Sequence, residues 1–106
     1  MALYSGTRNT SGAGDAIVTA GATTKLLVGR FIMLEGLAAG DNTIIVKFVK
    51  GASTVTVFTL TLSNDIKAGV FTLPDIQESV AGAALHVDLS AALAMRYQID
   101  VAQVGV

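Results

Sequence analysis

The stretch GASTVTVFTLTLSN, residues 51–64, decides the fold of this chain. It carries no charged side chain and consists mainly of Val, Thr, Phe and Leu, which favour a pleated and half-buried backbone. A strand of this composition tends to aggregate when it lies on an open sheet edge. We therefore expect it to be central in a sheet or covered by another chain. Either arrangement indicates an all-β protein that works in an assembly.

The apolar residues of this strand, residues 54–62, change phase midway. Val55 and Val57 share one face by alternation, whereas Phe58 and Leu60 share the opposite face. Such a switch indicates a bulge, or a strand whose halves pack against different neighbours.

The preceding segment, residues 43–50, is predicted to be a strand that a hairpin at residues 50–53 joins to residues 54–62. Its apolar residues Ile44, Val46 and Phe48 share one face, and the other face holds Ile45, Lys47 and Val49.

Residues 25–35, KLLVGRFIMLE, predict a long strand with apolar residues on both faces. Leu27, Phe31 and Met33 lie on one face; the other holds Leu26, Val28, Ile32 and Leu34, together with Arg30. Gly29 in the middle of the strand indicates a bulge or a close approach of backbone.

The rest of the chain follows the same pattern of short strands between turns. Further strands are expected at residues 15–20, 68–73, 85–89 and 95–104, and single helical turns at 75–80 and 90–94, capped by Asp75 and Ser90. Strands at this spacing without a helix of ordinary length predict an antiparallel β-sandwich or jelly-roll-like barrel of about seven or eight strands. We expect one domain over residues 16–106, preceded by a flexible, Gly- and Ser-rich N-terminal arm over residues 1–15.

The composition favours association. Of the 106 residues, 52% are hydrophobic and 14% are charged, against about 25% charged in ordinary soluble domains. The net charge of −1 gives little repulsion between copies. One interpretation is a monomer with a hydroxyl-rich surface; the other is apolar surface buried between subunits. The strands that are apolar on both faces favour the second interpretation.

Export and membrane insertion are not indicated. The start MALYSGTRNTSG lacks the basic region and apolar run of a secretory signal. No uncharged apolar run approaches the ~20 residues that span a bilayer as a helix. We expect synthesis in a cytoplasm and no membrane partner.

The sequence offers little chemistry. The sole histidine, His86, shares a strand face with Asp88, but no motif marks a nucleophile, so we expect no enzyme. One histidine, no cysteine and scattered carboxylates predict neither a metal site nor a cofactor. Gly12 and Gly14 lack the Lys-Ser/Thr of a phosphate-binding loop. The basic residues are dispersed, with Lys47 and Lys50 the nearest pair, so nucleic-acid binding is not expected.

The Gly-, Ser- and Thr-rich start SGTRNTSGAG and the strands IIVKFVKGASTVTVFTLTL resemble small virion proteins of tailed bacteriophages, especially capsid decoration (cement) proteins. The resemblance implies a non-enzymatic structural protein of the virion, assembled in the host cytoplasm. It also implies a homo-oligomer, with a trimer favoured, that stabilises a shell by contacting the major capsid protein or another virion protein.

Two functional hypotheses follow. In the first, the arm and the second apolar faces of the long strands form an assembly interface. Its expected residues are Leu3, Tyr4, Arg8, Val28, Arg30, Ile32, Ile45, Lys47 and Val49. The alternative is a sugar- or receptor-binding β-module of a fibre or tail, with its site in the loops near Asp41, Asp65 or Asp75.

Overall fold

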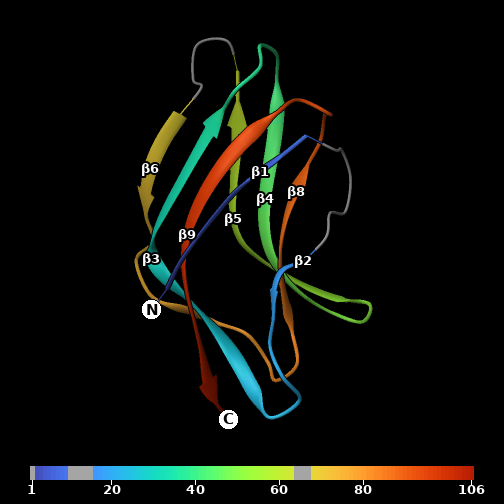
Figure 1. The fold of residues 1–106 in the computed structure, drawn as a ribbon, viewed down its shortest axis with the longest axis vertical. Helices are drawn as coiled ribbons and strands as arrows, with labels where there is room; N and C mark the ends of the chain where they lie inside the picture. The colour runs from blue at the N-terminus through green and yellow to red at the C-terminus, as the bar shows by residue number, and fades with distance from the viewer. Residues whose placement is uncertain (1, 10–15, 64–67) are drawn as a thin grey trace.

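The computed structural model describes residues 2–9, 16–63 and 68–106, which form nine β-strands and no helix (Figure 1). The strands are β1 (Ala2–Arg8), β2 (Ala16–Thr19), β3 (Thr24–Gly36), β4 (Asn42–Lys50), β5 (Ser53–Leu62), β6 (Ala68–Thr72), β7 (Gln77–Glu78), β8 (Ala84–Leu89) and β9 (Met95–Gly105). Every pairing between them is antiparallel, so the predicted all-β class is confirmed. Within these residues, no helix has the length and apolar character needed to cross a membrane.

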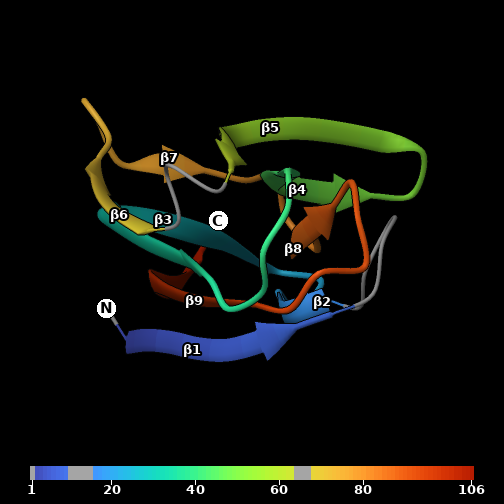
Figure 2. The ribbon, with the colours of Figure 1, turned by 90° about the horizontal axis from the view of Figure 1, so that it is seen from above.

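The strands form two sheets that stack as layers (Figure 2). Sheet A has the order β1-β9-β3-β6, with the short β7 also paired to β3, and sheet B has the order β2-β8-β4-β5. This is a β-sandwich, as the spacing of the strands predicted.

The strand order identifies the type of β-sandwich. When the two-residue β7 is left out, the chain forms nested pairs, β4–β5, β3–β6, β2–β8 and β1–β9, which belong alternately to sheet B and sheet A. That nesting is the strand order of a jelly roll. The pairing of β1 with β9 brings the two ends of the chain into neighbouring strands of one sheet.

The core lies between the sheets and takes one face of each long strand. From sheet A it receives Leu26, Val28, Ile32, Leu34, Met95, Tyr97, Ile99 and Val101. From sheet B it receives Ile44, Val46, Phe48, Leu62, Leu85, Val87 and Leu89. These are the residue sets that alternation groups together on β3, β4, β8 and β9, and removal of their apolar surface from water drives the packing of the sheets.

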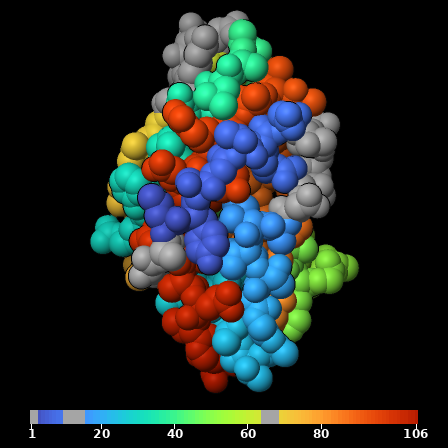
Figure 3. All heavy atoms as spheres, viewed as in Figure 1, coloured from blue at the N-terminus to red at the C-terminus, as the bar shows by residue number. Residues whose placement is uncertain are grey.

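Residues 2–8 correct the expectation of a flexible arm. They form β1, which pairs with β9 from Ala2 opposite Val101 to Arg8 opposite Met95. Tyr4 packs against the core, and Figure 3 shows β1 lying across β9 at the surface. The local Gly- and Ser-rich composition did not reveal the strand, because its partner is the far end of the chain. The remainder of the expected arm, residues 10–15, lies outside the described residues.

Neither predicted helical turn forms. In the first, Ser79 pairs with β3 instead: its N–H donates to the Leu26 carbonyl at 2.9 Å, and its Oγ accepts from the Leu26 N–H at 2.9 Å. In the second, Ser90 Oγ accepts a hydrogen bond from the Thr43 N–H at 2.7 Å and so caps the start of β4. Both hydroxyls serve a strand that is distant in sequence, which outweighs the local capping preference.

Candidate functional site

Strand β5 lies at the edge of sheet B and pairs with β4 along one side only. Its ten residues, STVTVFTLTL, carry no charge. Within the described part of the chain, the N–H and C=O groups that point away from β4 have no backbone partner on a neighbouring strand. Of the two arrangements that the sequence allowed, central or covered by another chain, the structure excludes the first.

The other described edge strands are better protected. β2 has four residues and β6 has five, and short edges offer little backbone for pairing. β1 has seven residues and includes Arg8. β5 is the longest of these edges and contains neither a charge nor a proline, so its main protective feature is a bulge.

The bulge lies where the sequence predicted the change of phase. The register of β5 against β4 shifts between Val46 and Lys47, so that Phe58 lies opposite Val46 and Thr56 opposite Lys47. Val57 is the extra residue. Because of this insertion, four threonines share the outer face of the sheet. They are Thr54, Thr56, Thr59 and Thr61, and all four are exposed.

The outer face of sheet B continues from this threonine row onto β4 and β8. Ile45, Lys47 and Val49, three of the predicted interface residues, lie there with half-buried side chains. Lys47 Nζ lies 2.5 Å from Asp88 Oδ2 on β8, and the two side chains are only 20% and 11% exposed. A largely desolvated pair of this kind fixes β4 against β8 and leaves no net charge from these two side chains beside β5.

Two predicted interface residues are wrong. Val28 and Ile32 are completely buried between the sheets of one chain and are not available to a second chain. The sequence grouped them correctly with Leu26 and Leu34, but alternation alone does not tell which face of a strand points inward.

The predicted residues of β1 and of the β3 bulge lie at or near the surface. Leu3 is 56% exposed, whereas Tyr4 packs inward and Arg8 is half-buried opposite Met95. Arg30 is exposed because β3 is irregular against β9 between Val28 and Ile32, and its Nε donates to the Leu73 carbonyl at 3.1 Å. The register thus shifts around Gly29, where the sequence predicted a bulge or a close approach of backbone.

An apolar patch on sheet A was missed. Phe31 is 46% exposed and Val70 is 59% exposed, and both lie on the outer face, with Val70 directly opposite Met33. Aromatic residues in strands usually pack inside, but the Phe31 ring does not. The alternation of β3 could have indicated this patch, since it places Phe31 and Met33 together on the face away from Ile32.

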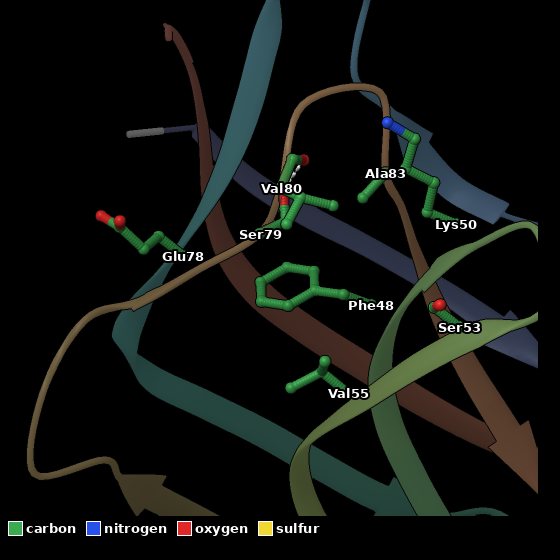
Figure 4. Close-up of a pocket in the computed structure, with 8 residues that line it drawn as sticks. All are labelled: Phe48, Lys50, Ser53, Val55, Glu78, Ser79, Val80 and Ala83. Carbon is green, nitrogen blue, oxygen red and sulfur yellow. Dashed lines mark hydrogen bonds between the residues drawn. The ribbon is translucent and has the colours of Figure 1, made fainter.

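A small pocket opens where the β4–β5 hairpin meets the segment before β8 (Figure 4). Its volume is about 230 Å³. Phe48, Val55, Val80 and Ala83 supply apolar lining, and Lys50 and Glu78 lie at opposite sides. Glu78 is already paired with Lys25, at 3.2 Å between Nζ and Oε1. The pocket can accommodate a small apolar group beside the Lys50 ammonium.

The residues that could carry chemistry are not brought together. Asp88 pairs with Lys47, and among the described residues His86 Nδ1 has no hydrogen-bond partner. No group of three His, Cys, Asp or Glu side chains within the described ranges is placed to hold a metal ion. Asp41 lies in the loop after β3, whereas Asp75 follows β6. Because β6 runs antiparallel to β3 and ends beside Arg30, the two carboxylates are not at the same end of this strand pair. Asp65 lies outside the described residues.

The sequence matches no protein-family model, and a search of curated proteins found no significant similarity. The open edge of β5 and the surfaces beside it are the features of the fold that bear on function.

Proposed function

We propose that this protein is a non-enzymatic structural protein whose fold is completed by contacts with other subunits. The single observation that carries the proposal is the position of β5, an uncharged ten-residue strand that, among the described strands, pairs with β4 along one side and with none along the other. Exposed main-chain groups on such a strand favour pairing with another chain.

The rest of the surface supports the same conclusion. Large apolar side chains remain exposed on a chain with a net charge of only −1: Leu3, Phe31, Leu37, Val55, Val70, Ile76, Val80 and Val106. They occur on both sheets and on the loops. Removing such surface from water stabilises association by about 25 cal/mol per Å² of apolar area before the costs of binding are subtracted.

The setting we propose is a virus shell, in which the protein acts as a decoration or cement protein. The resemblance of the sequence to small virion proteins of tailed bacteriophages supports this setting, and a jelly-roll sandwich is a fold that viral capsid proteins use. Weak contacts repeated over a symmetric lattice add up to a large stabilisation.

The test combines solution mass with shell binding. The purified chain is expected to self-associate in sedimentation velocity measurements. It is also expected to co-sediment with shells assembled from the major capsid protein encoded with it, and to raise their melting temperature. A chain that stays monomeric and does not bind these shells contradicts the proposal.

The pocket between Phe48 and Val80 favours a second candidate, a ligand-binding module. Its apolar lining and Lys50 suit a small apolar ligand with one negative charge. The dye 1-anilinonaphthalene-8-sulfonate has this chemistry. If the candidate is correct, the dye binds at one site per chain and Lys50→Glu abolishes binding, whereas Arg96→Glu, at an exposed position away from the lining, does not.

A further inference from the structure

We infer that the occupant of the open β5 edge is β5 of a second copy, paired antiparallel about a two-fold axis that passes between Val57 and Phe58. The inference deepens the proposed function and rests on it, because it assigns one subunit contact of the assembly. It would join two sheets of the order β2-β8-β4-β5 into one continuous sheet.

The sequence of β5 matches itself when reversed. From residue 54 to residue 61 it reads Thr, Val, Thr, Val, Phe, Thr, Leu, Thr. Antiparallel pairing about its centre sets Thr54 opposite Thr61 of the partner subunit and Thr56 opposite Thr59 of the partner subunit. It sets Val55 opposite Leu60 of the partner subunit and Val57 opposite Phe58 of the partner subunit. Every threonine then faces a threonine, and every apolar residue faces an apolar residue.

The bulge makes this match possible in three dimensions. In a regular strand, Thr56 and Thr59 would point to opposite faces of the sheet, because they are an odd number of residues apart. With Val57 inserted, Thr56 lies opposite Lys47 and Thr59 opposite Ile45, and both threonines point to the outer face. Thr54 and Thr61 follow, opposite Val49 and Thr43. Side chains that pair across the axis therefore lie on the same face of the joined sheet.

The same insertion brings the backbone into register. Along an antiparallel strand, residues alternate between those whose N–H and C=O bond to one neighbour and those whose groups point to the other side. Counted against β4, the four threonines belong to one class, whereas Val55, Phe58 and Leu60 belong to the other. In three of the four facing pairs, Thr54 with Thr61, Val55 with Leu60 and Thr56 with Thr59, both residues therefore belong to the same class. Both members of each of these pairs then point their N–H and C=O groups either at the partner strand or away from it, as a hydrogen-bonded ladder requires.

The absence of charge supports a second copy as the occupant. A two-fold contact is self-complementary, so a charge near the axis would meet its own equivalent or lie close to it. β5 has no charge over its whole length, and the nearest charged side chain on β4, Lys47, is neutralised by Asp88. Facing threonines and facing apolar pairs are both favourable across strands.

A two-fold contact differs from the three-fold contact of the trimer that the sequence resemblance implies. Solution mass separates the two, since β5 pairing by itself gives a dimer.

Disulfide trapping tests the register directly, because the chain has no cysteine of its own. Thr56→Cys and Thr59→Cys are made as separate single variants, which are then mixed and oxidised. Directly opposed residues in antiparallel strands have Cα atoms about 4.5–5.5 Å apart, within the range that a disulfide spans. We expect a covalent heterodimer from the mixture and little from either variant alone. Equal cross-linking in all three samples, or none in the mixture, overturns the inference.

A charge at the edge provides a second test that does not depend on cross-linking. Thr56→Lys places two like charges beside the axis and is expected to weaken dimerisation at least about tenfold in sedimentation measurements. Thr7→Lys adds the same charge to β1, an edge strand of the other sheet, and is expected to leave the dimer unchanged. Far-ultraviolet circular dichroism verifies that both variants fold.

The outcomes separate this inference from the proposed function. A chain that is monomeric, or a trimer that Thr56→Lys does not affect, overturns the β5 contact, and binding to shells then still tests the structural function. A β5 dimer that binds no shell upholds the contact and contradicts the decoration role.

Discussion

The rings of Phe58 and Phe71 lie with their centroids 4.9 Å apart and their planes inclined by 38°. Phe58 belongs to β5 and Phe71 to β6, which are edge strands of different sheets. The contact closes the sandwich along the side where these two edges meet. Aromatic pairs in such tilted arrangements contribute about 0.5–1.5 kcal/mol beyond the area they bury.

Gly69 allows the Phe71 ring to take this position. A Cβ at Gly69 would overlap the Phe71 ring, so Gly69→Ala must displace the ring and weaken its contact with Phe58. We expect the free energy of unfolding to fall by about 1–2 kcal/mol in urea denaturation. Gly105→Ala is the control, because a Cβ there meets nothing within 4 Å. Similar stabilities for the two variants would contradict this packing.

The ion pair of Lys47 and Asp88 is expected to contribute to stability, in contrast to the exposed pair of Glu35 and Arg96. The Lys47 and Asp88 side chains are 20% and 11% exposed, whereas those of Arg96 and Glu35 are 49% and 31% exposed. Asp88→Asn leaves a largely buried ammonium group without its counter-charge and should cost about 2–3 kcal/mol. Glu35→Gln should cost less than about 1 kcal/mol. Urea denaturation of both variants measures the difference, and equal losses would show that Asp88 is better solvated than the structure indicates.

Strand β1 is expected to be part of the folded core. Tyr4 packs against the core, while its neighbour Leu3 points outward and is 56% exposed. Tyr4→Ala should therefore lower the free energy of unfolding by about 2 kcal/mol, and Leu3→Ala by less than about 0.5 kcal/mol. Thermal unfolding measures both. If neither substitution changes the melting temperature, residues 2–8 behave as an arm after all.

Ser79 is expected to stabilise the junction between the segment after β7 and β3. Its side chain accepts the Leu26 N–H and donates to the Val80 carbonyl at 2.8 Å. Ser79→Ala leaves the Leu26 N–H without its side-chain acceptor in a buried position, at a cost of about 1–3 kcal/mol. Ser53→Ala, at an exposed position, serves as the control and should change stability little. Amide hydrogen exchange at Leu26 is a second readout and should become faster only in Ser79→Ala.

Alternation was a reliable guide to which residues share a face. It grouped Ile44, Val46 and Phe48, and its break located the bulge at Val57, since a break in a period of two is visible locally. The irregularity near Gly29 was indicated instead by a glycine in the middle of a strand. Capping signals were unreliable: no helical turn follows Asp75, where β7 forms instead, and the Ser90 hydroxyl bonds to β4, 47 residues away in sequence.

In the candidate site, too, some predictions from the sequence agree with the structure and others do not. Ile45, Lys47 and Val49 lie on an outer face, but Val28 and Ile32 turned out to be core. Which side of β3 points inward is decided by the sheet that packs on it, which the sequence of β3 does not contain.

By itself, the sequence determined that the chain is built of strands, and how the side chains of β3, β4, β5, β8 and β9 divide between the two faces of each strand. These properties follow from local sterics and from the two-residue period of a strand. Only the tertiary structure decided that β5 lies at an edge and that residues 2–8 pair with the last strand. Strand order depends on contacts between segments far apart in the chain, and no local pattern encodes which of many possible partners is chosen.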